Sequence, residues 1–132
     1  WGRLAFALSG VATTLWLGLV ALEITLGRAA PRAGDASALL LLRGLVETLI
    51  STAIVVNWLS TALLGAGLGA SGRYPGWLSG SGVALGVLIV LAVGVPRAAL
   101  GPTPLVDAAL FPGLATLSLV WLVALGLRLW RG

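Results

Sequence analysis

Residues 65–82 read GAGLGASGRYPGWLSGSG, and this glycine-rich stretch lies between two long apolar segments. It contains Gly67-x-Gly69-x-x-Gly72, which is the glycine spacing of a dinucleotide-binding turn. Such a turn needs a buried strand before it, a helix after it, and an acidic residue about 20 positions further on for the ribose. Here the glycines follow an apolar segment of helical length, and residues 91–95 read LAVGV. We therefore expect no bound nucleotide.

The glycines have a second spacing that favours helix packing. Several of them recur four residues apart, which places them on one face of a helix. In lipid, small residues on one face let two helix backbones approach closely, and van der Waals contact then drives their association. Thr14 extends the same pattern in the first apolar segment. We predict that six glycines pack helices together: Gly10, Gly18, Gly65, Gly69, Gly82 and Gly86.

The composition places the chain in a membrane. Of its 132 residues, 59% are hydrophobic and only 9% are charged, whereas soluble domains carry roughly 25% charged residues. The sequence therefore predicts an integral membrane protein whose first partner is the lipid bilayer. All eight basic residues are arginines, and they do not form the clustered positive surface that binds nucleic acid in water. We expect no nucleic-acid partner.

The residue types that are missing exclude several kinds of chemistry. The chain has no cysteine, histidine or methionine, so the usual ligands of haem, iron–sulfur clusters and zinc are absent. Thiol redox chemistry and catalysis by cysteine or histidine are excluded for the same reason. The only carboxylates are scattered along the chain, at Glu23, Asp35, Glu47 and Asp107. We expect no cofactor, no metal site and no catalytic residue, and we do not expect an enzyme.

Four apolar segments have the length of transmembrane helices, because about 20 residues at 1.5 Å each cross the hydrocarbon core. We expect Gly65 to end the second helix in the left-handed conformation of a C-cap. Pro112 is expected in the first turn of the fourth helix or at a kink. In lipid every backbone group must be bonded within a helix or a closed barrel. The sequence thus predicts an all-α integral membrane protein, with one membrane domain over residues 1–132 folded as an antiparallel four-transmembrane-helix bundle, its helices at about 4–26, 38–64, 81–100 and 108–130.

The distribution of the arginines along the chain bears on orientation. Four alternating spans place both termini and the loop at residues 70–80 on one side of the membrane. The arginine count is tied, with Arg3, Arg73, Arg128 and Arg131 on that side and Arg28, Arg32, Arg43 and Arg97 on the other. The first side has no acidic residue and carries Trp1, Tyr74, Trp77 and Trp130, an aromatic belt. We therefore expect a multi-pass protein of a prokaryotic inner (cell) membrane, oriented N-in and C-in.

Charges within the spans are the first place to look for a site, because each costs roughly 2.5–3.5 kcal/mol at a helix centre. Arg43 and Glu47 are four residues apart and are expected to form a local ion pair. The predicted topology brings further charges to the same end, giving one candidate polar cluster: Glu23, Arg43, Glu47, Arg97 and Asp107. Such a cluster forms either a vestibule for an ion, proton or small cation, or a set of interfacial salt bridges.

Two functions remain open at the level of sequence. The first is a non-catalytic accessory or structural subunit of a homo-oligomer or a larger membrane complex, with other membrane protein chains as partners. It is favoured by the lack of cofactor ligands and by more small-residue faces than one four-helix bundle needs. The alternative is a small ion or cation/proton-coupled transporter or channel that uses Glu23 and Glu47.

Overall fold

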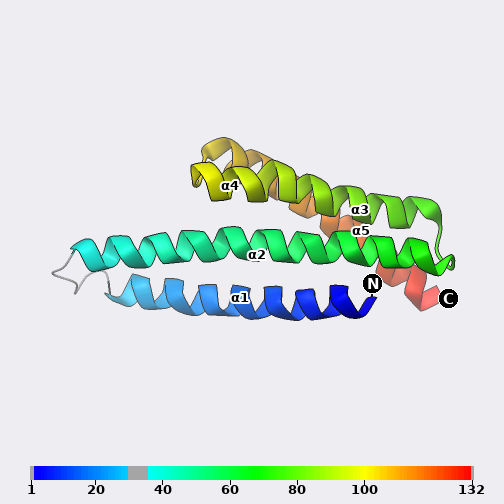
Figure 1. Cartoon of the computed structure of the whole chain (residues 1–132), viewed down its shortest axis with the longest axis horizontal. Coiled ribbons are helices and arrows are strands. Elements are labelled where there is room, and N and C mark those ends of the chain that lie inside the picture. The colour runs from blue at the N-terminus through cyan, green and yellow to red at the C-terminus, as the bar shows by residue number, and fades with distance from the viewer. Residues whose placement is uncertain (1, 30–35, 132) are drawn as a thin grey trace.

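The protein is helical in the part of the chain that its computed structural model describes, residues 2–29 and 36–131 (Figure 1). Two π-helical segments, η2 and η3, interrupt the α-helices. The helix α4 continues from α3 through η2 without a break, and α5 continues from η3. In chain order the elements are α1 (Gly2–Ala29), α2 (Ala36–Ser71), α3 (Gly76–Ile89), η2 (Val90–Gly94), α4 (Val95–Leu100), η3 (Leu105–Leu110) and α5 (Phe111–Arg131).

Four continuous helical stretches are long and apolar enough to cross a membrane. Within the described residues they are Arg3–Arg28, Ser37–Ser71, Gly76–Leu100 and Leu105–Trp130. This finding confirms the predicted all-helical class with four candidate spans, and it indicates a multi-pass membrane protein. The 36 residues of α2 extend over roughly 54 Å, which exceeds the ~30 Å of hydrocarbon.

The helices pack mainly against their neighbours in the chain. The most extensive contacts join α1 to α2 and α2 to α3, and α5 packs against α3. Figure 1 shows that the start of α1, the turn between α2 and α3, and the end of α5 lie at one end of the molecule. At the opposite end, α1 and α2 extend beyond the tip of α4.

The turn between α2 and α3 is shorter than the sequence predicts. The helix α2 does not end at 64 but continues through Gly65 to Ser71, and α3 begins at Gly76 instead of 81. Gly72, with φ of 65°, adopts the left-handed conformation that was expected at Gly65. Gly65 instead lies inside the helix at a close contact with α3, where an added Cβ would lie 2.6 Å from the Val83 nitrogen.

The glycines of α2 and α3 lie where the two helices approach most closely. An added Cβ at Gly86 would lie 2.5 Å from the Ala62 nitrogen and 2.5 Å from the Trp58 carbonyl oxygen, both in α2. At Gly69 an added Cβ would meet the Ser79 hydroxyl. That hydroxyl donates a hydrogen bond to the Gly65 carbonyl at 2.9 Å, so a polar link crosses the same interface.

Two of the six predicted packing glycines, Gly10 and Gly18, lie in α1 and have open space around them in the described structure. An added Cβ at Gly10 or Gly18 would meet nothing within 4 Å in the described structure. Instead, α1 meets α2 through residues seven apart, namely Ala5, Ala12 and Leu19, which are buried. Small alanines at this spacing bring the helices together without using the glycines.

Two buried polar contacts tie distant segments together. The Ser60 hydroxyl of α2 donates to the Ala5 carbonyl of α1 at 2.9 Å. In α5, the buried Trp121 donates from its indole Nε1 to the Leu78 carbonyl of α3 at 2.8 Å. The ring of Trp121 lies where a side chain at Gly82 would be. These contacts fix α1 and α5 to the central pair of helices.

Each π-helical segment ends two residues before a proline. In η2 the Val95 N–H bonds to the Val90 carbonyl, five residues back, and Pro96 follows. In η3 the Phe111 N–H bonds in the same way to Val106, and Pro112 follows. A proline ring clashes with the carbonyl four residues before it. The wider π turn moves that carbonyl aside, so each helix continues past its proline.

Candidate functional site

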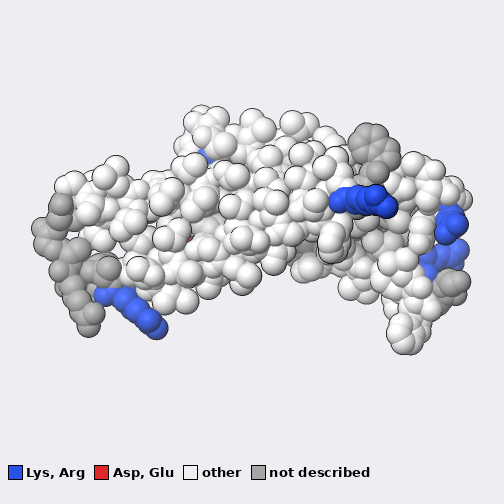
Figure 2. Space-filling view, turned by 60° about the horizontal axis from the view of Figure 1, so that its bottom comes forward, with Lys and Arg blue, Asp and Glu red and all other residues white. Residues whose placement is uncertain are grey.

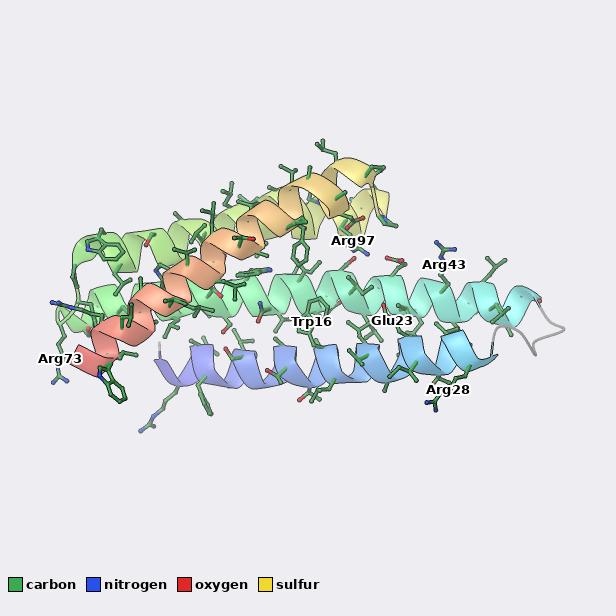
Figure 3. The ribbon with its side chains drawn as sticks, turned by 180° about the vertical axis from the view of Figure 1, so that it is seen from behind. Trp16, Glu23, Arg28, Arg43, Arg73 and Arg97 are labelled. Atoms are coloured by element: carbon green, nitrogen blue, oxygen red, sulfur yellow. The ribbon has the colours of Figure 1, made fainter. Side chains whose placement is uncertain are left out.

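Arg97 in α4 is the centre of an ion triad with Glu47 and Asp107. Its side chain is only 9% exposed. The guanidinium Nη2 donates to Glu47 Oε2 of α2 at 2.7 Å, and Nη1 donates to Asp107 Oδ1 of η3. Figure 3 shows Arg97 between α2 and the tip of the molecule at which α4 turns back toward α5. The triad therefore joins three elements at one point.

The turn between α4 and η3 holds two members of the triad in register. Gly101, with φ of 77°, allows the chain to reverse, and its N–H donates to the Arg97 carbonyl at 3.0 Å. On the other side of the turn, the Asp107 N–H donates to the Thr103 carbonyl at 2.9 Å. The π segments η2 and η3 also contact each other. Backbone hydrogen bonds on both sides of the turn thus help to position Arg97 and Asp107.

The triad carries an excess of negative charge. One guanidinium faces two carboxylates, so with all three groups ionised the net charge is −1. Both carboxylate side chains are 32% exposed, while Arg97 is buried. Among the described residues, Arg97 Nε is a buried donor without a hydrogen-bond partner. A buried arginine in this setting depends strongly on its two counter-charges.

The other two residues of the predicted polar cluster do not join the triad. Glu23 in α1 and Arg43 in α2 are both exposed, and no ion pair in the described part of the chain includes either one. The expected Arg43–Glu47 pair is therefore replaced by a pair between Glu47 and Arg97. In Figure 3 the side chain of Arg43 projects outward from α2, on the side of that helix opposite to Glu23.

A half-open pocket adjoins the triad between α2 and α4. Its volume is about 420 Å³. The side formed by α2 carries carboxylate, hydroxyl and apolar groups, and the side formed by α4 and the following turn is mostly apolar. Its lining residues are Glu47, Thr48, Ser51, Thr52, Val55, Val56, Arg97, Ala98, Gly101 and Pro102.

The hydroxyl groups of this pocket use their protons within their own helix. Thr48 donates to the Gly44 carbonyl at 2.9 Å, and Thr52 donates to the Thr48 carbonyl at 2.9 Å. Ser51 likewise donates to the Glu47 carbonyl at 3.0 Å. Each hydroxyl oxygen keeps lone pairs that can accept a hydrogen bond. The polar part of the α2 wall is therefore rich in acceptors.

The sequence predicts that Glu47, Arg97 and Asp107 lie at one end of the bundle. It does not predict that Arg97 pairs with both acids. The available signal was the pair of prolines, Pro96 and Pro112, each close to a charge in the sequence. A proline inside a helix implies a local break in the hydrogen-bond ladder. Such breaks often accompany functional sites, and here η2 lies just before Arg97 while η3 contains Asp107.

Comparisons of this chain with models of protein families, with curated proteins and with solved structures give no match. The described residues also contain no group of three or more acidic side chains placed to hold a metal ion. The function is therefore inferred from the residues and their geometry.

Proposed function

We propose that this protein is a non-catalytic structural subunit, which forms an antiparallel four-helix bundle in the bilayer and associates with further copies or with other membrane chains. The observation that carries the proposal is the exposed small-residue face of α1, formed by Gly10, Thr14 and Gly18. Added side chains at both glycines would meet nothing within 4 Å. Small residues on a lipid-facing helix favour close approach by another helix.

The hydrogen bonding of this face supports the same role. The Thr14 hydroxyl donates to the Gly10 carbonyl at 3.0 Å, so it does not project an unpaired donor into lipid. The helix α1 uses a different set of residues, Ala5, Ala12 and Leu19, to pack on α2. The glycine face therefore takes no part in packing within this chain and is free to contact another helix.

The ion triad supports a structural role over a catalytic one. Both Nη atoms of Arg97 are bound to carboxylates, so the guanidinium links three elements. Each carboxylate in turn accepts from this guanidinium, so the charged groups of the triad are used in contacts between helices. It serves to hold α4 and η3 against α2.

The subunit role predicts that the glycine face of α1 is needed for assembly. Gly10→Leu with Gly18→Leu should reduce the molar mass of the complex purified in mild detergent, because leucine holds two backbones apart. Gly27→Leu is the matched control, since Gly27 lies on the same helix and is equally open. Light scattering and identification of co-purified chains provide the measurement. An unchanged complex in the double variant would contradict the subunit role.

The proposed orientation is N-in and C-in, in a prokaryotic inner membrane. Figure 2 shows arginine side chains gathered at the end that carries the α2–α3 turn. Trp77 and Trp130, which belong to the expected aromatic belt, are strongly exposed. On the opposite side, Arg97 is neutralised by two carboxylates. Trp1, Arg32, Asp35 and the side chain of Arg131 lie outside the described part of the structure.

Single cysteines test this topology, because the chain has none of its own. A membrane-impermeant maleimide should label Ser37→Cys and Thr103→Cys from outside intact cells, and Ser71→Cys only after the cells are opened. Ser71 is exposed beside the α2–α3 turn, and Thr103 lies in the turn between α4 and η3. Labelling of all three positions from one side would rule out four alternating spans.

The pocket favours a second candidate function, a small cation- or proton-coupled transporter or channel that uses Glu47. Glu47 lines the pocket, whereas Glu23 does not. The transport candidate therefore rests on Glu47 alone. Proton and cation flux in proteoliposomes, compared between the native chain and Glu47→Gln, separates it from the structural role.

A further inference from the structure

The wall that α2 presents to the pocket offers acceptors and few donors. The hydroxyl protons of Thr48, Ser51 and Thr52 are all donated to carbonyl groups of α2 itself. Their oxygens therefore face a ligand as acceptors. Glu47 accepts from Arg97 through Oε2, and no described residue donates to its second oxygen. A ligand that meets this wall has to supply N–H or O–H groups.

The charge of the pocket selects a cation over an anion. The triad carries a net charge of −1 when its three groups are ionised. Arg97 already has two carboxylates as counter-charges, one at each Nη atom, so its positive charge is more than balanced. The Nε–H is buried, and the second hydrogen on each Nη belongs to a group whose net charge of −1 disfavours an anion. The nearest additional charge along α2 is Arg43, which is exposed and lies one turn before Glu47.

The remaining walls are apolar and set the size of the ligand. Val55, Val56, Ala98 and Pro102 line the rest of the pocket. A volume of about 420 Å³ is within the range of small-molecule sites, roughly 300–1,000 Å³. It accommodates a compact polar group together with several carbon atoms.

From these features we propose that the pocket binds a primary ammonium group carried on an apolar chain. An ammonium has three N–H donors and no acceptor, which complements the Glu47 carboxylate and the hydroxyl oxygens. Its apolar chain packs against the valines and Pro102. This site goes beyond the structural role proposed above, which does not need it. If the protein is a transporter, this site identifies ammonium compounds as its substrate class. The experiments below measure binding and do not depend on flux.

The same chemistry has two sources in a membrane. The pocket is half-open and is lined by residues of two candidate spans and of the turn that follows the second, so a phospholipid with an ethanolamine headgroup could supply the ammonium from the bilayer. A free alkylamine could supply it from water. Both sources present the same N–H donors to Glu47, and the composition of the lipid distinguishes them.

Cysteine chemistry gives a direct test of the charge preference. We compare Thr52→Cys, inside the pocket, with Thr116→Cys in α5, an exposed threonine that also donates to the carbonyl four residues before it. Each variant reacts with cationic aminoethyl methanethiosulfonate and with anionic sulfonatoethyl methanethiosulfonate, in a phosphatidylcholine bilayer. The ratio of cationic to anionic rates should be higher at Thr52→Cys by about tenfold, because the triad attracts one reagent and repels the other. Equal ratios at the two positions would overturn the proposal.

Protection by a ligand tests binding itself. Hexylammonium should slow the modification of Thr52→Cys by a neutral methanethiosulfonate severalfold, whereas hexanol and hexanoate should not. Adding Glu47→Gln should remove the protection. Equal protection by hexanol would show an apolar cleft without ammonium selectivity and would overturn the proposal. If the Glu47→Gln chain does not fold, the comparison of the three probes in the Thr52→Cys chain decides the matter.

The lipid arm identifies the source. Replacing part of the phosphatidylcholine by phosphatidylethanolamine should slow labelling at Thr52→Cys, relative to Thr116→Cys, if the headgroup occupies the pocket. Equal labelling in the two bilayers, together with protection by hexylammonium, assigns the site to a free amine. Equal labelling without such protection means that neither source binds and overturns the proposal.

Discussion

Replacing Arg97 by leucine is expected to lower the free energy of unfolding by about 3–5 kcal/mol. The reason is that the change leaves Glu47 and Asp107 facing each other without the guanidinium that links them. Loss of one member of a buried ion group costs more than the net value of the group, because the stranded charges stay poorly solvated. Equilibrium unfolding by sodium dodecyl sulfate from mild detergent, followed by tryptophan fluorescence, measures the change.

A triple variant separates charge compensation from packing. Arg97→Leu combined with Glu47→Gln and Asp107→Asn removes all three charges, so it should recover most of the stability that the single change loses. Arg43→Leu is the control, because Arg43 is exposed and belongs to no ion pair within the described residues. Its expected effect is below about 0.5 kcal/mol. A triple variant as unstable as Arg97→Leu would contradict charge compensation in the triad.

The second large effect is expected at Gly86, where even one methyl group is too many. Gly86→Ala should destabilise the protein by about 1–3 kcal/mol, because the new Cβ would lie 2.5 Å from backbone atoms of Ala62 and Trp58. Neither backbone atom can rotate out of the way, so α2 and α3 must separate. Gly86→Leu should lower stability further and shift the size-exclusion profile.

The matched control for Gly86 is the same substitution at an open glycine. Gly10→Ala adds a methyl group where nothing lies within 4 Å. Alanine favours a helix over glycine by up to about 1 kcal/mol, so this variant should be as stable as the native chain or slightly more stable. The two substitutions are chemically identical and differ in the sign of the expected effect. Equal stability for Gly86→Ala and Gly10→Ala would exclude close packing of α2 on α3.

The number and approximate position of the helices follow from the sequence because they depend on apolar length alone. Where the second helix ends could not be predicted in this way. Both Gly65 and Gly72 permit a left-handed conformation, and only the approach of α3 to Gly65 decides between them. The same holds for α1, whose contact with α2 uses Ala5 and Ala12. Alanines are common in any apolar helix, so the sequence alone does not show which alanines lie at a helix contact.

The sequence predicts which charged residues form the candidate site, but it does not predict which of them form ion pairs. Topology places Glu47, Arg97 and Asp107 at the same end, which the sequence indicates. The choice of partner for Glu47 depends on where the chain carries Arg97, which follows a π turn and a proline. Residues four apart on a helix are neighbours, which favours Arg43 as the partner of Glu47. Such a pair stabilises a helix by only about 0.2–0.5 kcal/mol. A buried guanidinium with two carboxylates is the stronger determinant.

The long separation between the members of the triad has a consequence for biosynthesis. Glu47 leaves the ribosome fifty residues before Arg97, and Asp107 follows ten residues later. At about 5–20 residues per second, roughly 2.5–10 seconds pass before the Glu47 carboxylate meets its counter-charge. During that interval the one cation available to Glu47 within the second span is Arg43, and a pair four residues apart on a helix contributes only about 0.2–0.5 kcal/mol. We therefore expect α2 to remain beside the insertion machinery until α3 and α4 arrive, so that the three enter the lipid as one unit.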